Sequence, residues 1–176
     1  FDLVSFWLPG PTRDRAYRKL RSKLLPIIAE NNKKKRKTSI VAHSFGTYLI
    51  ARLLSEETQV EIEHLILCGA IVSEDFRWDS VRRQIKGNII NDCGTHDIWP
   101  VLSSSTWGYG STGTFGFKNG IISDRVHYPL GHSAFFSKDF VRKWWLPLVL
   151  DDQILASQPL DRKKTYPWWV KALDTQ

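Results

Sequence analysis

A serine stands where an apolar strand pattern gives way to an apolar helix pattern. The run at 39–48 reads Ser-Ile-Val-Ala-His-Ser-Phe-Gly-Thr-Tyr, so that Ser44 has Ala42 two residues before it and Gly46 two residues after it. Small residues at these two positions are typical of a nucleophile elbow, a tight turn that exposes a serine hydroxyl at the carboxyl edge of a sheet. A larger side chain at either position is expected to collide with the backbone crossing. Ser44 is therefore the candidate nucleophile, and the alternative is a serine that only caps the helix.

A serine nucleophile needs a base and an acid that orients the base, and candidates for both follow in the chain. Asp97 comes after an apolar strand pattern at 88–92 and a glycine, and Asp92, at the end of that pattern, is the alternative acid. His132 follows a glycine beyond the last predicted strand. The order serine, aspartate, histidine is the one expected when the nucleophile sits on such an elbow. The sequence favours Asp97 as acid and His132 as base, although either aspartate could simply cap a turn.

The other histidines are expected to be structural. His43 is adjacent to Ser44, so on a strand its side chain points to the opposite face and cannot easily take the hydroxyl proton. His127 falls inside a predicted strand, and His64 and His96 lie farther from the expected position of the base. His132 is therefore the preferred base.

The chemistry of this set is acyl transfer. His132 would take the hydroxyl proton, Asp97 would hold the imidazole in one tautomer, and Ser44 would attack an acyl carbonyl to give a covalent intermediate. The backbone N–H of Phe45 is the expected oxyanion donor. The sequence has neither a cysteine and histidine cluster with metal-ligand spacing nor a phosphate-binding loop motif. We therefore expect no metal and no cofactor.

A glycine-rich and aromatic run at 103–120 is expected to be an ordered loop without a helix. Its aromatic side chains are candidates for an apolar acyl pocket above the nucleophile, and packing within the loop is an equally good interpretation. The candidate substrate-binding residues are Trp107, Tyr109 and Phe115.

Strand and helix patterns alternate along the chain, which predicts an α/β fold with a mostly parallel sheet covered by helices on both faces. Strands are expected at 2–8, 38–42, 62–68, 88–92 and 121–128, and helices at 12–28, 45–54, 78–85 and 137–146. Thr12 is expected to cap the first helix, and Pro26 to kink or divide it. The apolar face of that helix is expected to contain Ala16, Leu20, Leu24, Ile27 and Ile28.

The length of 176 residues and the 42% hydrophobic content predict one globular domain. We expect this domain at 1–150 and a C-terminal extension at 151–176, whose Trp168 and Trp169 would pack on the domain or dock a partner. Because the chain begins at Phe1 within an apolar strand pattern, we expect a fold that lacks its early strands.

The formal net charge of +7 is concentrated in the run at 33–37, Lys-Lys-Lys-Arg-Lys. This run contains no aromatic residue or glycine, so a solvated loop is favoured over a nuclear signal or a phosphate-binding patch, and nucleic acid is not an expected partner. No apolar run reaches the roughly 18 residues of a transmembrane helix, and no signal-peptide pattern occurs. Cys68 and Cys93 make a poor disulfide framework, so the cytoplasm is the expected compartment.

Five segments together resemble serine hydrolases of the α/β-hydrolase superfamily, in particular poorly characterised bacterial lipase/esterase-like members. They lie at 39–54, 94–100, 107–110, 115–117 and 131–136, and the resemblance extends from Phe1 to about Leu150. It implies that the chain is the C-terminal two-thirds of an α/β-hydrolase domain that acts on an ester or thioester. In such a domain a second oxyanion donor is expected after an earlier strand, which is not in this chain. The alternative is a non-catalytic module of the same fold that binds a partner or an anionic surface.

Overall fold

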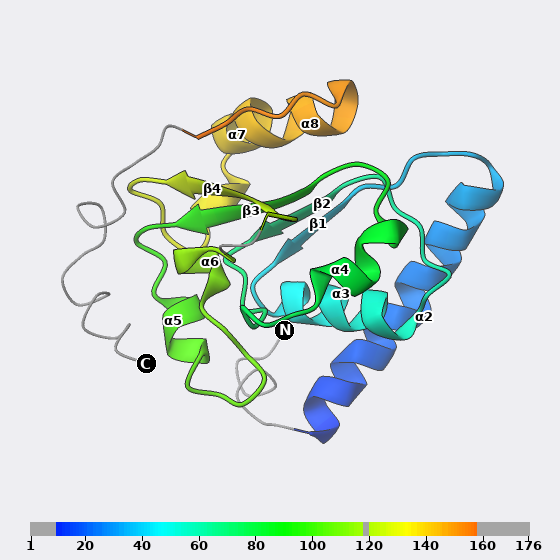
Figure 1. Cartoon of the computed structure of the whole chain (residues 1–176), viewed down its shortest axis with the longest axis horizontal. Helices are drawn as coiled ribbons and strands as arrows, with labels where there is room; N and C mark the ends of the chain where they lie inside the picture. The colour runs from blue at the N-terminus through cyan, green and yellow to red at the C-terminus, as the bar shows by residue number, and fades with distance from the viewer. Residues whose placement is uncertain (1–9, 118–119, 158–176) are drawn as a thin grey trace.

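The computed structural model describes residues 10–117 and 120–157, and the strand predicted at 2–8 and the pair Trp168 and Trp169 lie outside these ranges. Within the described part, four parallel strands form one sheet in the order β1-β2-β3-β4 (Figure 1). The strands are β1 (Ile40–His43), β2 (Leu65–Cys68), β3 (Ile89–Gly94) and β4 (Ser123–His127). The chain is therefore of the α/β class, as the sequence predicts.

Helices cover both faces of the sheet (Figure 1). One face carries α2 (Pro11–Lys33), α3 (Phe45–Glu56), α4 (Trp78–Val81) and the 3₁₀ turn η1 (Arg82–Gln84). The other face carries η2 (Ala134–Phe136), α7 (Lys138–Phe140), the π-helical turn η3 (Val141–Trp145) and α8 (Leu146–Asp151). Two short helices, α5 (Trp99–Ser103) and α6 (Thr112–Phe115), lie beyond the carboxyl end of β3.

Strand β2 shows why both faces must be covered. Leu65 and Leu67 belong to the hydrophobic core on the α2 and α3 side, whereas Ile66 and Cys68 belong to a second core on the α7 and α8 side. All four side chains are fully buried. A strand that is buried on both faces reads as a continuous apolar run, which is the pattern that predicted this strand.

The ends and the course of α2 differ from the prediction. Gly10 is the N-cap and Pro11 is the first helical residue, so Thr12 lies inside the helix and does not cap it. Proline suits this first position because its φ is already helical and the N–H it lacks would have had no partner in the helix. Pro26 does not divide the helix, which runs from Pro11 to Lys33. Pro26 is exposed, so water can satisfy the carbonyl that loses its donor.

The apolar face of α2 is also narrower than predicted. Ala16, Leu20 and Leu24 pack partly buried against the core, and Ile28 is 2% exposed. Ile27, in contrast, is 53% exposed, so its predicted burial is wrong. Successive residues of a helix are about 100° apart, and two neighbouring isoleucines cannot both face the sheet.

Four other segments depart from their predicted form. The strand predicted at 62–68 is regular only from Leu65, and Ile62 forms an isolated bridge with Ile85. The helix predicted at 78–85 is divided into α4 and η1, and the one predicted at 137–146 continues through η3 and α8 to Asp151. The loop at 103–120 contains the short helix α6, so the prediction that it has no helix is wrong.

The basic run forms the end of α2 and the connection to β1, and its residues at 33–37 are all exposed. This exposure agrees with the predicted solvated segment, although Lys33 belongs to α2 and not to the loop. The charge is more unevenly distributed than this run alone suggests. Residues 11–37 contain eleven of the 25 lysines and arginines but only two of the 18 acidic residues, so this segment carries +9 and the remainder carries −2.

Cys68 and Cys93 are both free and buried. Across the described residues, no helix combines the length and the hydropathy that crossing a bilayer requires.

Candidate active site

Ser44 forms a strained turn between β1 and α3. Its φ of 52° and ψ of −125° lie in a region that residues with a side chain rarely adopt. Its backbone N–H donates to the carbonyl of Cys68 at the end of β2 (3.1 Å), and Thr47 Oγ1 donates to its carbonyl (2.6 Å). The Ser44 hydroxyl makes no capping hydrogen bond to α3. The turn thus has the form of the predicted elbow and not that of a helix cap.

The two small residues of the elbow have different surroundings. Ala42 is buried, with 5% of its surface exposed. A Cβ on Gly46 would meet no atom within 4 Å outside its own helix, so the predicted collision is wrong at this position. Gly46 lies in the first turn of α3 on a side that neighbouring elements leave open. Phe45 begins α3, which places its backbone N–H at the positive end of the helix dipole.

Asp97 and His132 are brought together by the loops that follow β3 and β4. His132 Nδ1 lies 2.8 Å from Asp97 Oδ2 and 3.0 Å from Oδ1. A carboxylate only accepts hydrogen bonds, so the proton of the neutral ring is on Nδ1 and the lone pair of Nε2 is available. Asp97 is fully buried and also accepts a hydrogen bond from the Trp99 N–H (3.1 Å). This is the orientation that a histidine base requires.

Gly69, directly after β2, packs against this pair. Its φ is +53°, and a Cβ there would lie 2.9 Å from Asp97 Oδ2 and 3.0 Å from His132 Nδ1. On its other side, a Cβ on Gly113 of α6 would lie 2.1 Å from the backbone nitrogen of Ala70. Sequence reasoning did not assign Gly69 a role, although a glycine that ends a strand is a signal of close packing.

His43 connects the elbow to the loop of His132. Its Nε2 donates to the backbone carbonyl of His132 (2.8 Å), and the two rings lie 4.4 Å apart, centroid to centroid. Among the described residues, no hydrogen bond joins Ser44 Oγ to His132. Such bonds often become short only when substrate binds. His43 therefore fits the structural role that the sequence indicates.

We expect the neutral form of His43 to contribute to stability. Burial lowers the pKa of His43 from its ordinary value of 6.5, and the nearby His132 lowers it further. The unfolded chain then binds more protons than the native protein below pH 6.5, so this contribution is complete above 6.5 and is lost as the pH falls towards the native pKa. In urea unfolding at about pH 8 and about pH 5, His43→Gln should lose less stability on acidification than the wild type. Equal losses would contradict this assignment.

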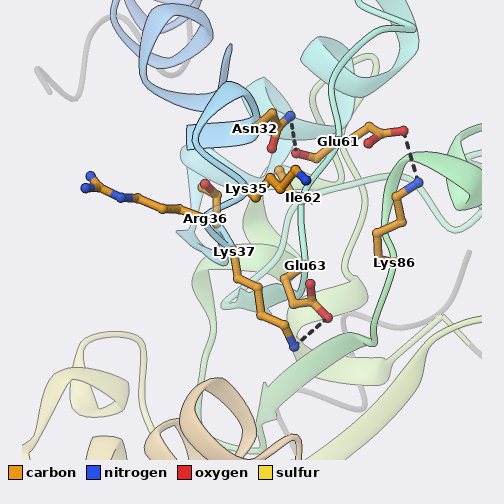
Figure 2. A pocket seen from close by; sticks show the side chains of 9 residues that line it. Asn32, Lys35, Arg36, Lys37, Glu61, Ile62, Glu63 and Lys86 are labelled. Carbon is orange, nitrogen blue, oxygen red and sulfur yellow. Dashed lines mark hydrogen bonds and ion pairs between the residues drawn. The ribbon is translucent and has the colours of Figure 1, made fainter. Parts of the chain in front are cut away.

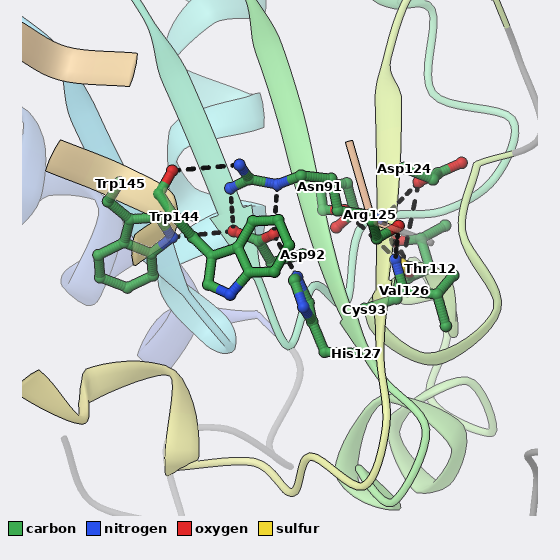
Figure 3. A network of polar contacts seen from close by, with 11 residues as sticks. Asn91, Asp92, Cys93, Thr112, Asp124, Arg125, Val126, His127, Trp144 and Trp145 are labelled. Atoms are coloured by element: carbon green, nitrogen blue, oxygen red, sulfur yellow. Dashed lines mark hydrogen bonds and ion pairs between the residues drawn. The ribbon is translucent and has the colours of Figure 1, made fainter. Parts of the chain in front are cut away.

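The alternative acid, Asp92, belongs to a separate network on the α7 and α8 side (Figure 3). Arg125 donates to both carboxylate oxygens through Nε (2.7 Å) and Nη2 (2.8 Å). His127 Nε2 lies 2.7 Å from Oδ1, and Trp145 Nε1 donates to Oδ2 (2.9 Å). Arg125 also donates to the carbonyl of Trp144 (3.1 Å). The structure therefore pairs His132 with Asp97, and it places Asp92 and His127 in a buried structural cluster.

The predicted substrate-binding aromatics differ in exposure. Trp107 is 91% exposed, whereas Tyr109 and Phe115 are 6% and 7% exposed. The ring of Tyr109 packs edge-on against Tyr48 and Phe45, with centroids 5.1 and 6.3 Å apart. Burial raises the pKa of Tyr109 to about 12. A role of these residues in acyl binding stays a prediction.

A shallow cavity of about 230 Å³ lies at the opposite edge of the sheet, beside the basic loop (Figure 2). Lys37 pairs with Glu63 (3.2 Å) and Lys86 with Glu61 (3.0 Å), while Arg36 points away from the other lining residues. Two of its cations are thus already neutralised by carboxylates, which favours a solvated surface over a phosphate-binding patch.

Glu63, His64 and Asp152 bring three potential metal-ligand atoms together near this loop. His64 Nδ1 accepts a hydrogen bond from the Asn88 N–H (3.1 Å), so Nε2 carries the proton and donates to Asp152 Oδ1 (2.8 Å). A ligating nitrogen needs its lone pair. His64 therefore holds Asp152, the residue after α8, against the sheet. Because His64 Nε2 carries a proton, this nitrogen has no lone pair to offer a metal ion.

The fold and the site together define an α/β chain with a strained serine turn, whose preceding residue, His43, contacts the histidine of a histidine and aspartate pair. Comparison with protein-family models, curated proteins and solved structures finds no match to the chain.

Proposed function

We propose that this chain is the catalytic part of a serine hydrolase of the α/β-hydrolase type, which cleaves a carboxylic ester or thioester. Ser44 is the nucleophile, His132 the base and Asp97 the acid. The observation that carries the proposal is the buried Asp97 holding the Nδ1 proton of His132, beside a serine in a strained strand-to-helix turn. Both the backbone strain and the buried charge cost stability, and such features cluster at functional sites.

The reaction follows from the positions of the protons. The Ser44 proton passes to His132 Nε2 as Oγ bonds to the acyl carbon, and the oxyanion accepts a hydrogen bond from the Phe45 N–H. The leaving alkoxide or thiolate takes the proton from His132 as its bond to the acyl carbon breaks. Water then repeats these steps on the acyl-enzyme and releases the acid.

The order of elements supports the same proposal. Ser44 follows β1, Asp97 follows β3 and His132 follows β4, and all three lie beyond the carboxyl ends of their strands. Ligands of open parallel sheets bind at this edge. The expected partner is an acyl compound, including a lipid, and the expected compartment is the cytoplasm, where the free thiols of Cys68 and Cys93 would remain reduced.

Labelling with a fluorophosphonate probe tests the proposal. We expect one label on the wild-type protein, located on Ser44 by peptide mass spectrometry, and none on Ser44→Ala. His132→Ala should label at least about a hundredfold more slowly, because the hydroxyl loses its base. Ser80→Ala, which removes an exposed serine on α4, should label like the wild type. A folded wild-type protein that does not label would overturn the proposal and favour a non-catalytic module that binds a partner or an anionic surface.

Gly69→Ala should separate the acid and the base. The added methyl group would overlap Asp97 Oδ2 and His132 Nδ1, so we expect labelling of Ser44 to slow by about tenfold or more. Gly10→Ala is the matched control, because Gly10 also has a positive φ, of 83°, but has no atom within 4 Å of the added Cβ. Both variants should lose about 1–2 kcal/mol through backbone strain. Equal labelling rates in the two variants would show that Gly69 does not support the pair.

A further inference from the structure

Arg13, in the first turn of α2, is a buried guanidinium. It is 6% exposed, and the described residues contain no carboxylate that forms an ion pair with it. Its Nη1 donates to the backbone carbonyl of Trp107 (3.1 Å). Its Nε and Nη2 are buried and have no hydrogen-bond partner. A buried charge with unused donors is costly, and such a group requires an explanation.

The two donors without a partner, Nε and Nη2, form the edge of the guanidinium that binds carboxylates. Nε and Nη2 lie on the same side of a guanidinium and match the two oxygens of a carboxylate. The same chain shows this use of the edge, because Arg125 Nε and Nη2 bind the two oxygens of Asp92 at 2.7 and 2.8 Å. In Arg13 the equivalent edge forms no hydrogen bond, and among the described residues no carboxylate pairs with it.

The position of Arg13 connects it to the candidate active site. Its guanidinium carbon lies 4.1 Å from the centre of the Tyr109 ring and 5.8 Å from that of Tyr48. Both rings pack against Phe45, the residue after Ser44, with centroids 6.3 and 5.9 Å from its ring. Tyr48 and Tyr109 thus lie against both the Arg13 guanidinium and the ring of Phe45. At these distances the two rings interact favourably with the positive charge of the guanidinium.

We propose that Arg13 binds a carboxylate of the substrate, so that the enzyme prefers acyl compounds that carry a negative charge away from the scissile bond. This inference rests on the proposed function. It replaces the expectation of a purely apolar acyl pocket with one in which these aromatic rings contact the chain of the substrate and Arg13 contacts its charged end.

The kinetic test compares aryl half-esters of dicarboxylic acids, from succinate to suberate, with aryl esters of uncharged fatty acids of equal length. The wild-type kcat/KM should favour the charged ester at one length. Arg13→Gln should reduce this preference by about tenfold to a hundredfold, the usual effect of losing a charge-assisted pair. Arg13→Lys keeps the charge but not the two-donor edge, so it should restore only part of the preference.

Arg15→Gln is the matched control. Arg15 is an exposed arginine two residues along α2, and its replacement changes the net charge equally. It should keep the wild-type preference. A wild type without a preference at any length, or an equal loss in Arg15→Gln, would overturn the inference. A fall of kcat/KM for both esters by the same factor in Arg13→Gln and Arg13→Lys would also overturn it, since this would show that Arg13 only supports the loop at Trp107.

A binding measurement separates this inference from the proposed function. Dicarboxylates should raise the Tm of Ser44→Ala, and they should raise it less when Arg13→Gln is added. If the wild type does not label with the fluorophosphonate but this shift is seen, the hydrolase proposal fails and the anion site remains. If Ser44 labels but neither the shift nor the charge preference is found, the hydrolase proposal remains and the role of Arg13 is disproved.

Discussion

Asp92→Asn should destabilise the protein by about 3–5 kcal/mol, a large part of the stability of an ordinary domain. The substitution keeps the shape of the side chain but removes the charge that pairs with Arg125, and it places an N–H₂ group among donors. Arg125 is 2% exposed, so water cannot replace the lost carboxylate. Urea unfolding followed by circular dichroism measures the change.

Asp79→Asn is the matched control for Asp92→Asn. Asp79 also accepts two hydrogen bonds from one arginine, Arg77, at 3.3 and 2.9 Å, but both side chains are more than half exposed. Its loss should cost less than about 1 kcal/mol, because water screens a surface pair. Similar losses in the two variants would mean that the Asp92 network contributes no more than a surface ion pair.

The effect of Asp92→Asn should also depend on pH in a defined direction. Burial alone would raise the pKa of Asp92, but the hydrogen bonds from His127 and Arg125 outweigh it and hold this pKa below its ordinary value of 3.8. The contribution of the charged form is therefore complete above pH 3.8 and is lost as the pH falls through the native pKa. The difference between the wild type and Asp92→Asn should persist at neutral pH and narrow only in strong acid.

Asp97→Asn should slow labelling of Ser44, and turnover of aryl esters, by about a thousandfold to ten-thousandfold. The Asn oxygen can still accept the hydrogen bond from the Trp99 N–H, which turns the amide nitrogen towards His132. That N–H₂ group donates to Nδ1 and moves the ring proton to Nε2, where it blocks removal of the Ser44 proton. The loss should appear in kcat and not in KM, because substrate contacts are unchanged.

Asp152→Asn is the control for this experiment, because Asp152 also pairs with a histidine, His64, at 2.8 Å. It lies at the other edge of the sheet, so labelling should stay within about twofold of the wild type. A folded Asp97→Asn variant that labels at the wild-type rate would show that Asp97 is not the acid.

The parts of the site that could be predicted from the sequence are those set by local pattern or by chain order. The elbow at Ser44 could be predicted because a strand, two small residues and a helix follow one another within sixteen residues. The pairing of Asp97 with His132 followed from order, since the loops after neighbouring parallel strands meet at one edge. The catalytic roles of these residues stay predictions.

The parts that could not be predicted depend on packing between distant segments. Asp92 is bound by groups 33 to 53 residues away, from β4 and the turn before α8, and no local pattern indicates this. Arg13 is one of eleven lysines and arginines at 11–37, and only its packing against Tyr109, from a distant segment, distinguishes it from the others. The predictions for α2 are wrong for a different reason. Thr12 was expected to cap the helix, but Pro11 already starts it. Pro26 was expected to break the helix, but it lies on the exposed face, where water can satisfy the carbonyl that loses its donor.

The uneven charge of the chain has a consequence for the speed of encounter. With +9 at residues 11–37 and −2 elsewhere, the electrostatic potential is strongest around α2, and Arg13 lies in its first turn. A negatively charged molecule diffusing nearby is drawn first to this helix, so its association rate should exceed that of a neutral molecule of the same size. Salt shortens the reach of the field to about 10 Å at 0.1 M, and the advantage of the anion should therefore fade as ionic strength rises.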